Sequence, residues 1–313
     1  MSRELVLLFP GQGSQKPGMG EDVAGAFPAA RDVFDRVDEA LGTSLSRLCF
    51  AGPADELTLT HNAQPALFAH GAALWAVLRE AFGAQVRAAA GHSLGEFTAY
   101  HAAGALGVEQ GARLVRRRGE LMYEAGVARP GAMAALLGDL GEPVEALCER
   151  ASRDAGEVVP ANYNSPGQLV VSGEVAGVER VMELAKAAGA KRAVRLNVSG
   201  AFHSPLMRPA ADGLADALAE AGMGAPAFPV ASNVTADLVT EAGEARALLV
   251  RQLTSPVRWT ELVRTLAIRY PDALFVELGP GNVLAGLVKR IAPELSTAAC
   301  GTAADVEHLL HLA

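Results

Sequence analysis

The sequence has few cysteines and few aromatic residues. Only Cys49, Cys148 and Cys300 occur among 313 residues, and their wide separation excludes the close ligand spacing of a zinc or iron–sulfur site. An odd number also excludes a fully paired disulfide framework, so we expect reduced thiols in a cytoplasmic protein. Aromatic residues make up 5% of the chain, while alanine and glycine are abundant. We therefore expect many helices and a core of small side chains.

The sequence also lacks an excess of positive charge and any long apolar run. The net charge is -8, which argues against a general nucleic-acid surface, and the one dense basic block is 116–118. The apolar run 5–9 is too short for a signal peptide or a membrane span. With 50% hydrophobic and 20% charged residues, the composition is that of a soluble globular protein. The length fits one large domain or a domain with an insertion.

The segment GHSLGE, residues 91–96, contains the pattern G-x-S-x-G around Ser93. This pattern is typical of a nucleophile presented on a sharp turn from a strand to a helix. The glycines permit the crowded turn, and the N–H groups of the following helix point toward a developing oxyanion. The alternative is a glycine-flanked serine that only caps a helix.

A glycine-rich loop follows the first predicted strand, 5–9. Gly11 and Gly13 begin a dinucleotide-binding pattern, but Lys16 stands where its third glycine belongs. A Walker motif is excluded as well, since no Gly-Lys-Ser/Thr is present. We therefore expect the loop to bring backbone N–H groups close to something bound.

Between residues 131 and 198 the order of predicted elements is β-α-β-β-α-β, a ferredoxin-like unit. The last of its strands is predicted over 191–198. Short strands separated by helices flank this unit on both sides. The predicted fold is α/β: a larger hydrolase-like domain with a short parallel sheet, residues 1–130 and 199–313, and an inserted ferredoxin-like subdomain, residues 131–198.

Arg118 lies in the apolar stripe of a helix predicted over 107–124. Its neighbours three and four positions away are all apolar, namely Leu114, Val115, Leu121 and Met122. A buried charge needs a partner. Two interpretations are open. In the first, Arg118 has a structural role, either in an ion pair or with its guanidinium extended past the apolar stripe to water. In the second, its guanidinium binds a carboxylate of the substrate with two hydrogen bonds.

A serine needs a base, and His203 is the histidine best placed to serve. It lies in a loop among small residues, whereas the side chain of His92 should point away from that of Ser93. No carboxylate between Ser93 and His203 has a clear loop position after a strand, except Asp139. A Ser-His dyad, oriented by a backbone carbonyl or an amide, is the economical alternative to a triad.

Eight segments in order along nearly the whole chain resemble those of the malonyl-CoA:acyl carrier protein transacylases, including the related acyltransferases of polyketide synthesis. They are FPGQGSQ (9–15), GHSLGE (91–96), RRRGELM (116–122), NSPGQLVVSG (164–173), AFHSPLM (201–207), SNVTAD (232–237), QLTSPVRWTE (252–261) and ELGPGNVLAGL (277–287).

The resemblance implies a role for each matching residue. Ser93 would be the nucleophile that takes the malonyl group as an ester, and His203 the general base and then the general acid. Gln252 would orient the histidine, mostly through its backbone carbonyl. Gln12 and Leu94 would donate backbone N–H groups to an oxyanion hole, which would account for the glycines beside Gln12.

The resemblance also implies how the acyl group is selected. Arg118 would bind the free carboxylate of malonate, which favours the second of the two alternatives above. Phe202, in the sequence GAFH, resembles the malonyl-selective form and would leave no room for an α-methyl group. Gln64 and Asn162 would be supporting residues around the site.

The implied reaction is a ping-pong transfer of malonyl from malonyl-CoA to the phosphopantetheine thiol of an acyl carrier protein. We expect no metal or redox cofactor and a monomer. Arg116, Arg117, Lys191 and Arg195 are candidates for steering the acidic carrier, with plain solubility as the alternative. The alternatives in function are an acyl hydrolase on the same scaffold, a serine esterase of the α/β-hydrolase class, and a non-catalytic docking protein. Arg118 argues against the first, and the missing acid and the ferredoxin-like insertion argue against the second. The joint presence of Ser93, His203 and Arg118 argues against the third.

Overall fold

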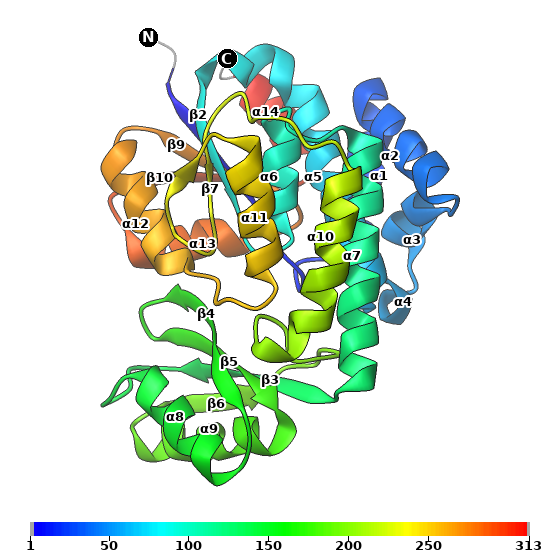
Figure 1. The fold of residues 1–313 in the computed structure, drawn as a ribbon. Helices are drawn as coiled ribbons and strands as arrows, with labels where there is room; N and C mark the ends of the chain where they lie inside the picture. Colours follow the sequence, from blue (N-terminus) through cyan, green and yellow to red (C-terminus); the bar gives the residue numbers. More distant parts are fainter. Residues whose placement is uncertain (1–2, 312–313) are drawn as a thin grey trace.

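The computed structural model describes residues 3–311, which form a large lobe around one sheet and a small lobe around another (Figure 1). The sheet of the large lobe has six strands in the order β10-β9-β1-β2-β7-β8. All neighbours are parallel except β7 and β8. The strands are β1 (Leu5–Phe9), β2 (Val86–Gly91), β7 (Val230–Ala231), β8 (Leu238–Val239), β9 (Leu274–Leu278) and β10 (Ser296–Cys300).

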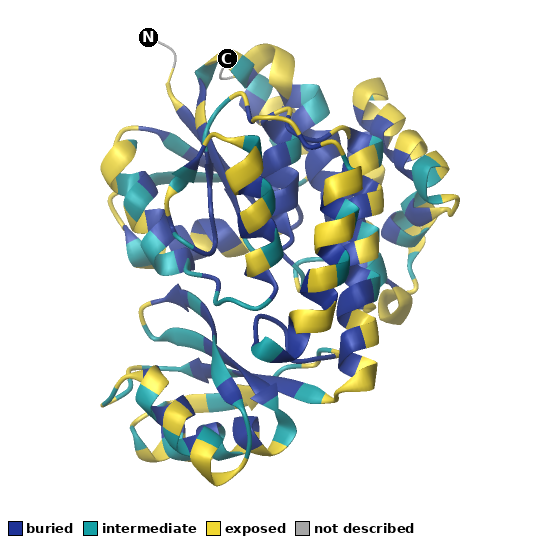
Figure 2. Ribbon diagram, viewed as in Figure 1, coloured by how far each residue is buried: buried dark blue, intermediate teal, exposed yellow. Residues whose placement is uncertain are grey.

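Side chains of β1 face alternate sides of the sheet, and a layer of helices buries each side. Leu5, Leu7 and Phe9 belong to one apolar core, while Val6 and Leu8 belong to a second. This is why β1 reads as a continuous apolar run rather than as an alternating one. Figure 2 shows the result, with buried residues on the inner faces of the helices and exposed ones outside.

The first core lies under most helices of the large lobe, and the second lies under α12 and α13. The helices of the large lobe are α1 (Glu21–Ala26), α2 (Pro28–Leu41), α3 (Leu45–Ala51), α4 (Ala54–Thr58), α5 (Thr60–Phe82), α6 (Gly95–Ala102), α7 (Val108–Ala128), α10 (Arg208–Glu220), α11 (Ala242–Gln252), α12 (Trp259–Arg269), α13 (Val283–Ile291) and α14 (Ala303–Leu310), with short 3-10 turns at Gly83–Gln85 and Pro205–Met207.

The small lobe is an antiparallel sheet in the order β4-β5-β3-β6 with two helices on one face. Its elements are β3 (Gly131–Leu137), α8 (Val144–Asp154), β4 (Val158–Ser165), β5 (Gln168–Glu174), α9 (Val175–Ala187) and β6 (Arg192–Arg195). The lobe has an apolar core of its own. The predicted fold class, a parallel-containing α/β sheet with a separate ferredoxin-like unit, is confirmed, while the division at residues 130 and 198 stays a prediction.

One predicted boundary is wrong. The strand predicted over 191–198 ends at Arg195. The chain makes one more bond, from Leu196 N to Met133 O, and then leaves the sheet so that Leu196 and Val198 face a cavity between the lobes.

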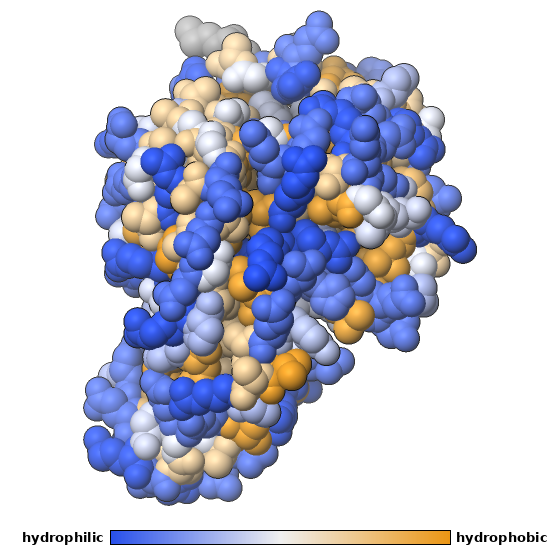
Figure 3. All heavy atoms as spheres, turned by 45° about the vertical axis from the view of Figure 1, so that its right-hand side comes forward, coloured by the Kyte–Doolittle hydropathy of each residue, from blue (hydrophilic) through white to orange (hydrophobic). Residues whose placement is uncertain are grey.

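On the face that Figure 3 shows, hydrophilic side chains predominate and the apolar ones form small separate groups. Within residues 3–311, no helix combines the length and the hydropathy that crossing a membrane would require. The predicted cytoplasmic location and monomeric state remain predictions.

Candidate active site

Ser93 stands on the tight turn between β2 and α6, and its backbone has a φ of 51°. The flanking glycines are needed because the chain is crowded on both sides. A Cβ on Gly91 would lie 1.8 Å from the Gly95 carbonyl carbon, and one on Gly95 would lie 2.0 Å from Phe9 O. The alternative that Ser93 only caps a helix is not found. Ser93 Oγ contacts other side chains and does not cap α6.

Asn233, in the loop after β7, holds this strained turn in place. Its Oδ1 accepts a hydrogen bond from Ser93 N at 2.7 Å, and its Nδ2 donates to Gly91 O at 2.7 Å. Asn233 is fully buried. A left-handed conformation at a residue other than glycine persists only where the surroundings enforce it, and these two bonds are part of that enforcement.

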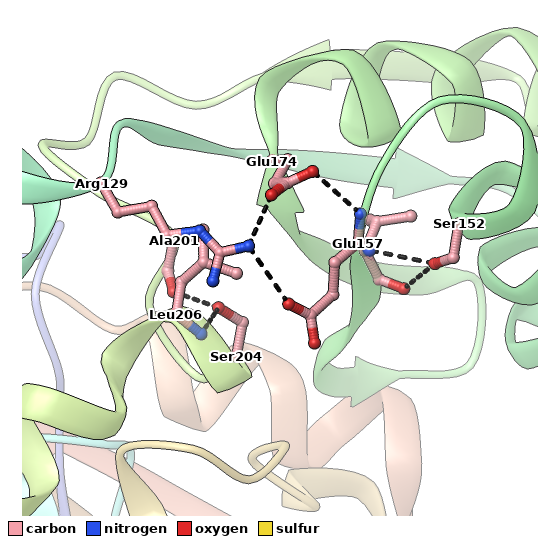
Figure 4. Close-up of polar contacts among 8 residues, drawn as sticks. Arg129, Ser152, Glu157, Glu174, Ala201, Ser204 and Leu206 are labelled. Carbon is pink, nitrogen blue, oxygen red and sulfur yellow. Dashed lines mark hydrogen bonds and ion pairs between the residues drawn. The ribbon is translucent and has the colours of Figure 1, made fainter.

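His203 lies beside the serine, in the loop that precedes the 3-10 turn. Its Nε2 is 2.8 Å from Ser93 Oγ and its Nδ1 is 2.9 Å from the backbone oxygen of Gln252. Its φ of 58° is also left-handed. Ser204 fixes the loop, because its Oγ donates to Ala201 O and accepts from Leu206 N (Figure 4).

The second ring nitrogen of His203 therefore meets a carbonyl and no carboxylate. A carbonyl can only accept, so Nδ1 carries the proton and Nε2 is free to take one from Ser93. Burial, with help from the Arg118 charge, lowers the pKa of His203 to about 3. The imidazole is neutral at physiological pH, as a base must be. Asp139, the possible acid of a triad, lies away in the small lobe beside Gly167.

Arg118 extends from α7 into the same site and is 1% exposed. Its Nη1 donates to Gln64 Oε1 at 2.7 Å, and its Nη2 donates to Gln252 Oε1 at 2.8 Å and to Ser93 Oγ at 3.1 Å. The guanidinium lies 5.4 Å from the centroid of the Phe97 ring.

No carboxylate of the described residues forms an ion pair with Arg118, and its Nε has no hydrogen-bond partner. Burial lowers its pKa, yet a guanidinium stays protonated at neutral pH. Neither the structural ion pair nor the water-exposed arginine is found. What remains is a buried cation held in place by neutral amides, which is suited to an incoming anion.

The cavity at this site has a volume of about 180 Å³ and lies between the lobes. Its walls include the predicted Gln12, Leu94, Asn162 and Phe202, while Gln64 and Gln252 support Arg118 from behind. The other lining residues are His92, Ser93, Arg118, Met122, Met133, Asn164, Val170, Leu196, Val198 and His203. All the predicted site residues are therefore brought to one place, although their roles stay predictions.

Two backbone N–H groups are available for an oxyanion. Among the described residues, neither Gln12 N nor Leu94 N has a hydrogen-bond acceptor. Gly11 lets the loop approach the nucleophile turn, because a Cβ there would lie 2.5 Å from His92 O. The side chain of Gln12 donates a hydrogen bond from Nε2 to Thr60 Oγ1 at 3.3 Å. Gln12 and Leu94 both line the cavity that contains Ser93, and their role in an oxyanion hole stays a prediction.

Sequence reasoning missed two polar residues around the site. His92 lines the cavity, where its Nε2 is 2.8 Å from Asn164 Oδ1 and its ring packs on Trp259. Glu96 is fully buried, and its Oε2 accepts from Gln252 Nε2 at 2.6 Å. Burial raises the pKa of Glu96 to about 7. Both residues belong to the segment GHSLGE, so their position beside Ser93 in the sequence could have indicated that they lie near the site.

The predicted carrier-steering residues lie on the surface or near it. Arg117 pairs with Glu120 and Glu124 on α7, and Arg195 pairs with a glutamate of α9. Arg116 is half-buried against Asn62, and Lys191 is exposed. Among residues 3–311, no three His, Cys, Asp or Glu side chains gather as a metal site would require. The expected mechanism without a metal stays a prediction.

Residues 6–305 match the family model described as "Acyl transferase domain". The malonyl CoA-acyl carrier protein transacylase of Bacillus subtilis (strain 168) is 46% identical over 304 residues, which cover 97% of this chain and 95% of that protein. A crystal structure of acyl-carrier-protein S-malonyltransferase from Bartonella henselae has a TM-score of 0.94 at 42% identity, covering 99% of each chain.

A third similar structure contains two proteins. It is a malonyl transacylase in complex with a type II polyketide synthase acyl carrier protein. Its matching chain is 43% identical with a TM-score of 0.93, over 98% of this chain and 99% of that one. The similarity therefore extends over both lobes and the cavity between them.

Proposed function

This chain belongs to the acyltransferase family, and we propose that it transfers a malonyl group from malonyl-CoA to the phosphopantetheine thiol of an acyl carrier protein, in fatty acid or polyketide synthesis. The observation that carries the proposal is Arg118. A buried guanidinium that has no ion-pair partner among residues 3–311 lies 3.1 Å from the nucleophile, within reach of a short dicarboxylic acyl group. A neutral acyl group would leave this cation unpaired.

In the first half-reaction, Ser93 Oγ attacks the thioester carbonyl of malonyl-CoA while His203 Nε2 takes the hydroxyl proton. The carbonyl oxygen becomes an oxyanion and accepts from Gln12 N and Leu94 N. The C–S bond then breaks, and the proton on His203 passes to the leaving CoA sulfur. The product is a malonyl ester on Ser93 and free CoA.

In the second half-reaction, the thiol of the carrier arm gives its proton to His203 Nε2 and attacks the ester carbonyl. The C–O bond breaks and Ser93 Oγ takes the proton back, which restores the free enzyme. Through both halves, the Gln252 carbonyl holds the imidazole in the tautomer with Nδ1 protonated, and Arg118 holds the malonyl carboxylate. CoA and carrier thioesters are substrates, and none of these steps calls on a metal or redox cofactor.

Phe202 precedes the base and lines the cavity, where it is 5% exposed. Its ring occupies space beside the carbon next to the thioester carbonyl, so malonyl is favoured over methylmalonyl. A methyl group changes such a preference by about 1–3 kcal/mol, so some methylmalonyl is still accepted.

Transfer to a carrier is favoured over hydrolysis. The relatives over nearly the whole chain are named for transfer to acyl carrier protein, and one similar protein was solved in complex with a carrier. An acidic carrier needs basic residues near the cavity. Arg116, Arg117, Lys191 and Arg195 are the proposed contacts, and of these Lys191 is exposed and forms none of the ion pairs found within residues 3–311.

Intact-protein mass spectrometry after mixing with malonyl-CoA, methylmalonyl-CoA or acetyl-CoA tests this function. We expect a malonyl adduct on the wild type, a weaker methylmalonyl adduct, and no adduct on Ser93→Ala. Adding a phosphopantetheinylated carrier protein should move the malonyl mass to the carrier. Release of free malonate at the same rate with and without the carrier would instead identify a hydrolase.

A further inference from the structure

Glu96 forms the centre of a buried network behind the reacting groups. Its Oε2 accepts two hydrogen bonds, from Gln252 Nε2 at 2.6 Å and from Asn233 N at 3.2 Å. Glu96, Gln252 and Asn233 are all fully buried. One carboxylate oxygen of α6 therefore joins the loop after β7 to the end of α11, and both lie far from Glu96 in the sequence.

Each of the two donor residues also forms hydrogen bonds with a group of the active site. Gln252 Nε2 also donates to Ser93 O at 3.0 Å, and its Oε1 accepts from Arg118 Nη2. The orientation of this amide sets the position of the arginine, because only one end of it can accept. Asn233 in turn accepts from Ser93 N and so holds the strained turn. The first path leads to the acyl carboxylate and the second to the nucleophile.

We propose that Glu96 is a positioning residue for acyl selection: by fixing the Gln252 amide it aims Arg118 at the acyl carboxylate, and by fixing Asn233 it holds Ser93 in the attacking conformation. This inference rests on the proposed malonyl transfer. Glu96 touches neither substrate nor the reacting atoms, so it acts through these two residues.

In this proposal the positioning role comes from the acceptor oxygen of Glu96, beside a coulombic attraction between the Glu96 carboxylate and Arg118. Oε1 of Glu96 has no partner among the described residues, so a proton there would leave both bonds to Oε2 intact. A glutamine can present its carbonyl oxygen to the same two donors. A leucine fills similar volume but offers no acceptor. It would leave one N–H of Gln252 Nε2 and the backbone N–H of Asn233 buried without a partner.

The test compares kcat/KM for acylation by malonyl-CoA and by acetyl-CoA. Glu96→Leu should lower acetyl loading about tenfold through Ser93 and malonyl loading about 100-fold, so that the malonyl-to-acetyl ratio falls about tenfold. Glu96→Gln should stay within about threefold of the wild type for both. In the Arg118→Ala background, Glu96→Leu should leave the ratio unchanged.

Glu277 supplies a matched control. It is equally buried, its Oε2 accepts from Ala285 N at 2.8 Å, and its Oε1 also lacks a partner within residues 3–311. Glu277→Leu should lower thermal stability while leaving the ratio unchanged. A ratio that moves as much in this control as in Glu96→Leu would reduce Glu96 to a structural residue.

Other outcomes are equally decisive. Folded Glu96→Leu with an unchanged ratio, or Glu96→Gln as impaired as Glu96→Leu, would overturn the inference. If Glu96→Leu does not fold, Glu96→Asp replaces it: its shorter carboxylate cannot reach both donors, so the ratio should fall, and an unchanged ratio would contradict the role. A wild type that takes no malonyl adduct would instead refute the proposed function itself.

Discussion

The two lobes contribute different kinds of group to one cavity. The large lobe supplies every buried charge or reactive group there, including Ser93, Arg118 and His203. The small lobe supplies apolar and amide side chains such as Met133, Asn162 and Val170. Charged residues of the small lobe lie at its surface, as in the ion pair of Arg150 with Glu142.

This difference separates the residues that react or carry charge from those that only shape the cavity. Buried hydrogen-bonded charges are costly to disturb, because a lost partner leaves a desolvated group behind. An apolar wall that loses a methyl group gains space at some cost in stability, but it leaves no polar group without a partner. Changes of the buried polar and charged residues in the large lobe should therefore alter the rate of acylation and the recognition of the acyl carboxylate. Changes in the apolar wall should alter only the size of the acyl group that is accepted.

The largest effect is expected for His203→Ala. Without a base, Ser93 keeps its proton, and we expect acylation by malonyl-CoA to fall about 1,000-fold, within the usual range for removal of a general base. Quenched-flow sampling with mass detection of the malonyl adduct measures the rate. A loss below about tenfold would show that another group accepts the proton.

The pH dependence offers a second check on His203. Its pKa is lowered to about 3 in the folded protein, so the imidazole stays neutral as the pH falls below 6.5. We expect kcat/KM for loading to show no inflection from His203 between pH 5.5 and 8, given that a histidine of ordinary pKa, about 6.5, would lose activity there. An inflection near pH 6.5 that disappears in His203→Ala would contradict this expectation.

Arg118→Ala should give the next largest effect. Malonyl loading should fall about 100-fold because the carboxylate loses a buried, hydrogen-bonded partner, while acetyl loading should change much less. Arg118→Lys is the control: it keeps the charge but lacks the planar fork, so it should recover only part of the malonyl rate. An equal loss for both acyl groups would mean that Arg118 serves Ser93 and not the substrate.

The sequence was sufficient for the parts of the molecule that have a local signal. The apolar run of β1 and the glycines around Ser93 predict a strand and a nucleophile turn because each reflects a nearby steric or burial constraint. Together with the β-α-β-β-α-β order, they predict the fold class. The base, the arginine fork and the oxyanion loop came as a set only through the resemblance of whole motifs.

Other features have no local signal. β2 contains Ala88, Ala89 and Ala90, poor strand formers, and it is a strand because β1 and β7 pair with it on both sides. Glu96 reads as an ordinary residue of a helix first turn. Its proposed positioning role comes from hydrogen bonds with Gln252 and Asn233, which lie 156 and 137 positions away in the sequence. These contacts can be recognised only in the folded chain.

Phe202→Ala tests whether a large-lobe residue can affect acyl selection without affecting the rate of malonyl loading. Phe202 belongs to the large lobe, and its proposed role is to fill space in the cavity. Malonyl loading should therefore stay within about threefold of wild type, while the methylmalonyl-to-malonyl ratio rises about tenfold. Competition between the two CoA esters, read by mass, gives the ratio. Val170→Ala, on the small-lobe wall, is the matched comparison and should shift the ratio less, because it removes a smaller volume.

The smallest effect is expected for Arg129→Ala, at the junction of the lobes. Arg129 follows α7, and its Nη2 is 2.5 Å from Glu174 Oε1 and 3.6 Å from Glu157 Oε2 in the small lobe (Figure 4). The arginine side chain is 53% exposed, so water and salt screen these pairs. The melting temperature should fall by about 1–2 °C at low salt and not at all in 0.5 M salt, and malonyl loading should stay within about twofold. A large loss of loading with an unchanged melting temperature would mean that lobe alignment itself controls the chemistry, and would break the separation between the two lobes.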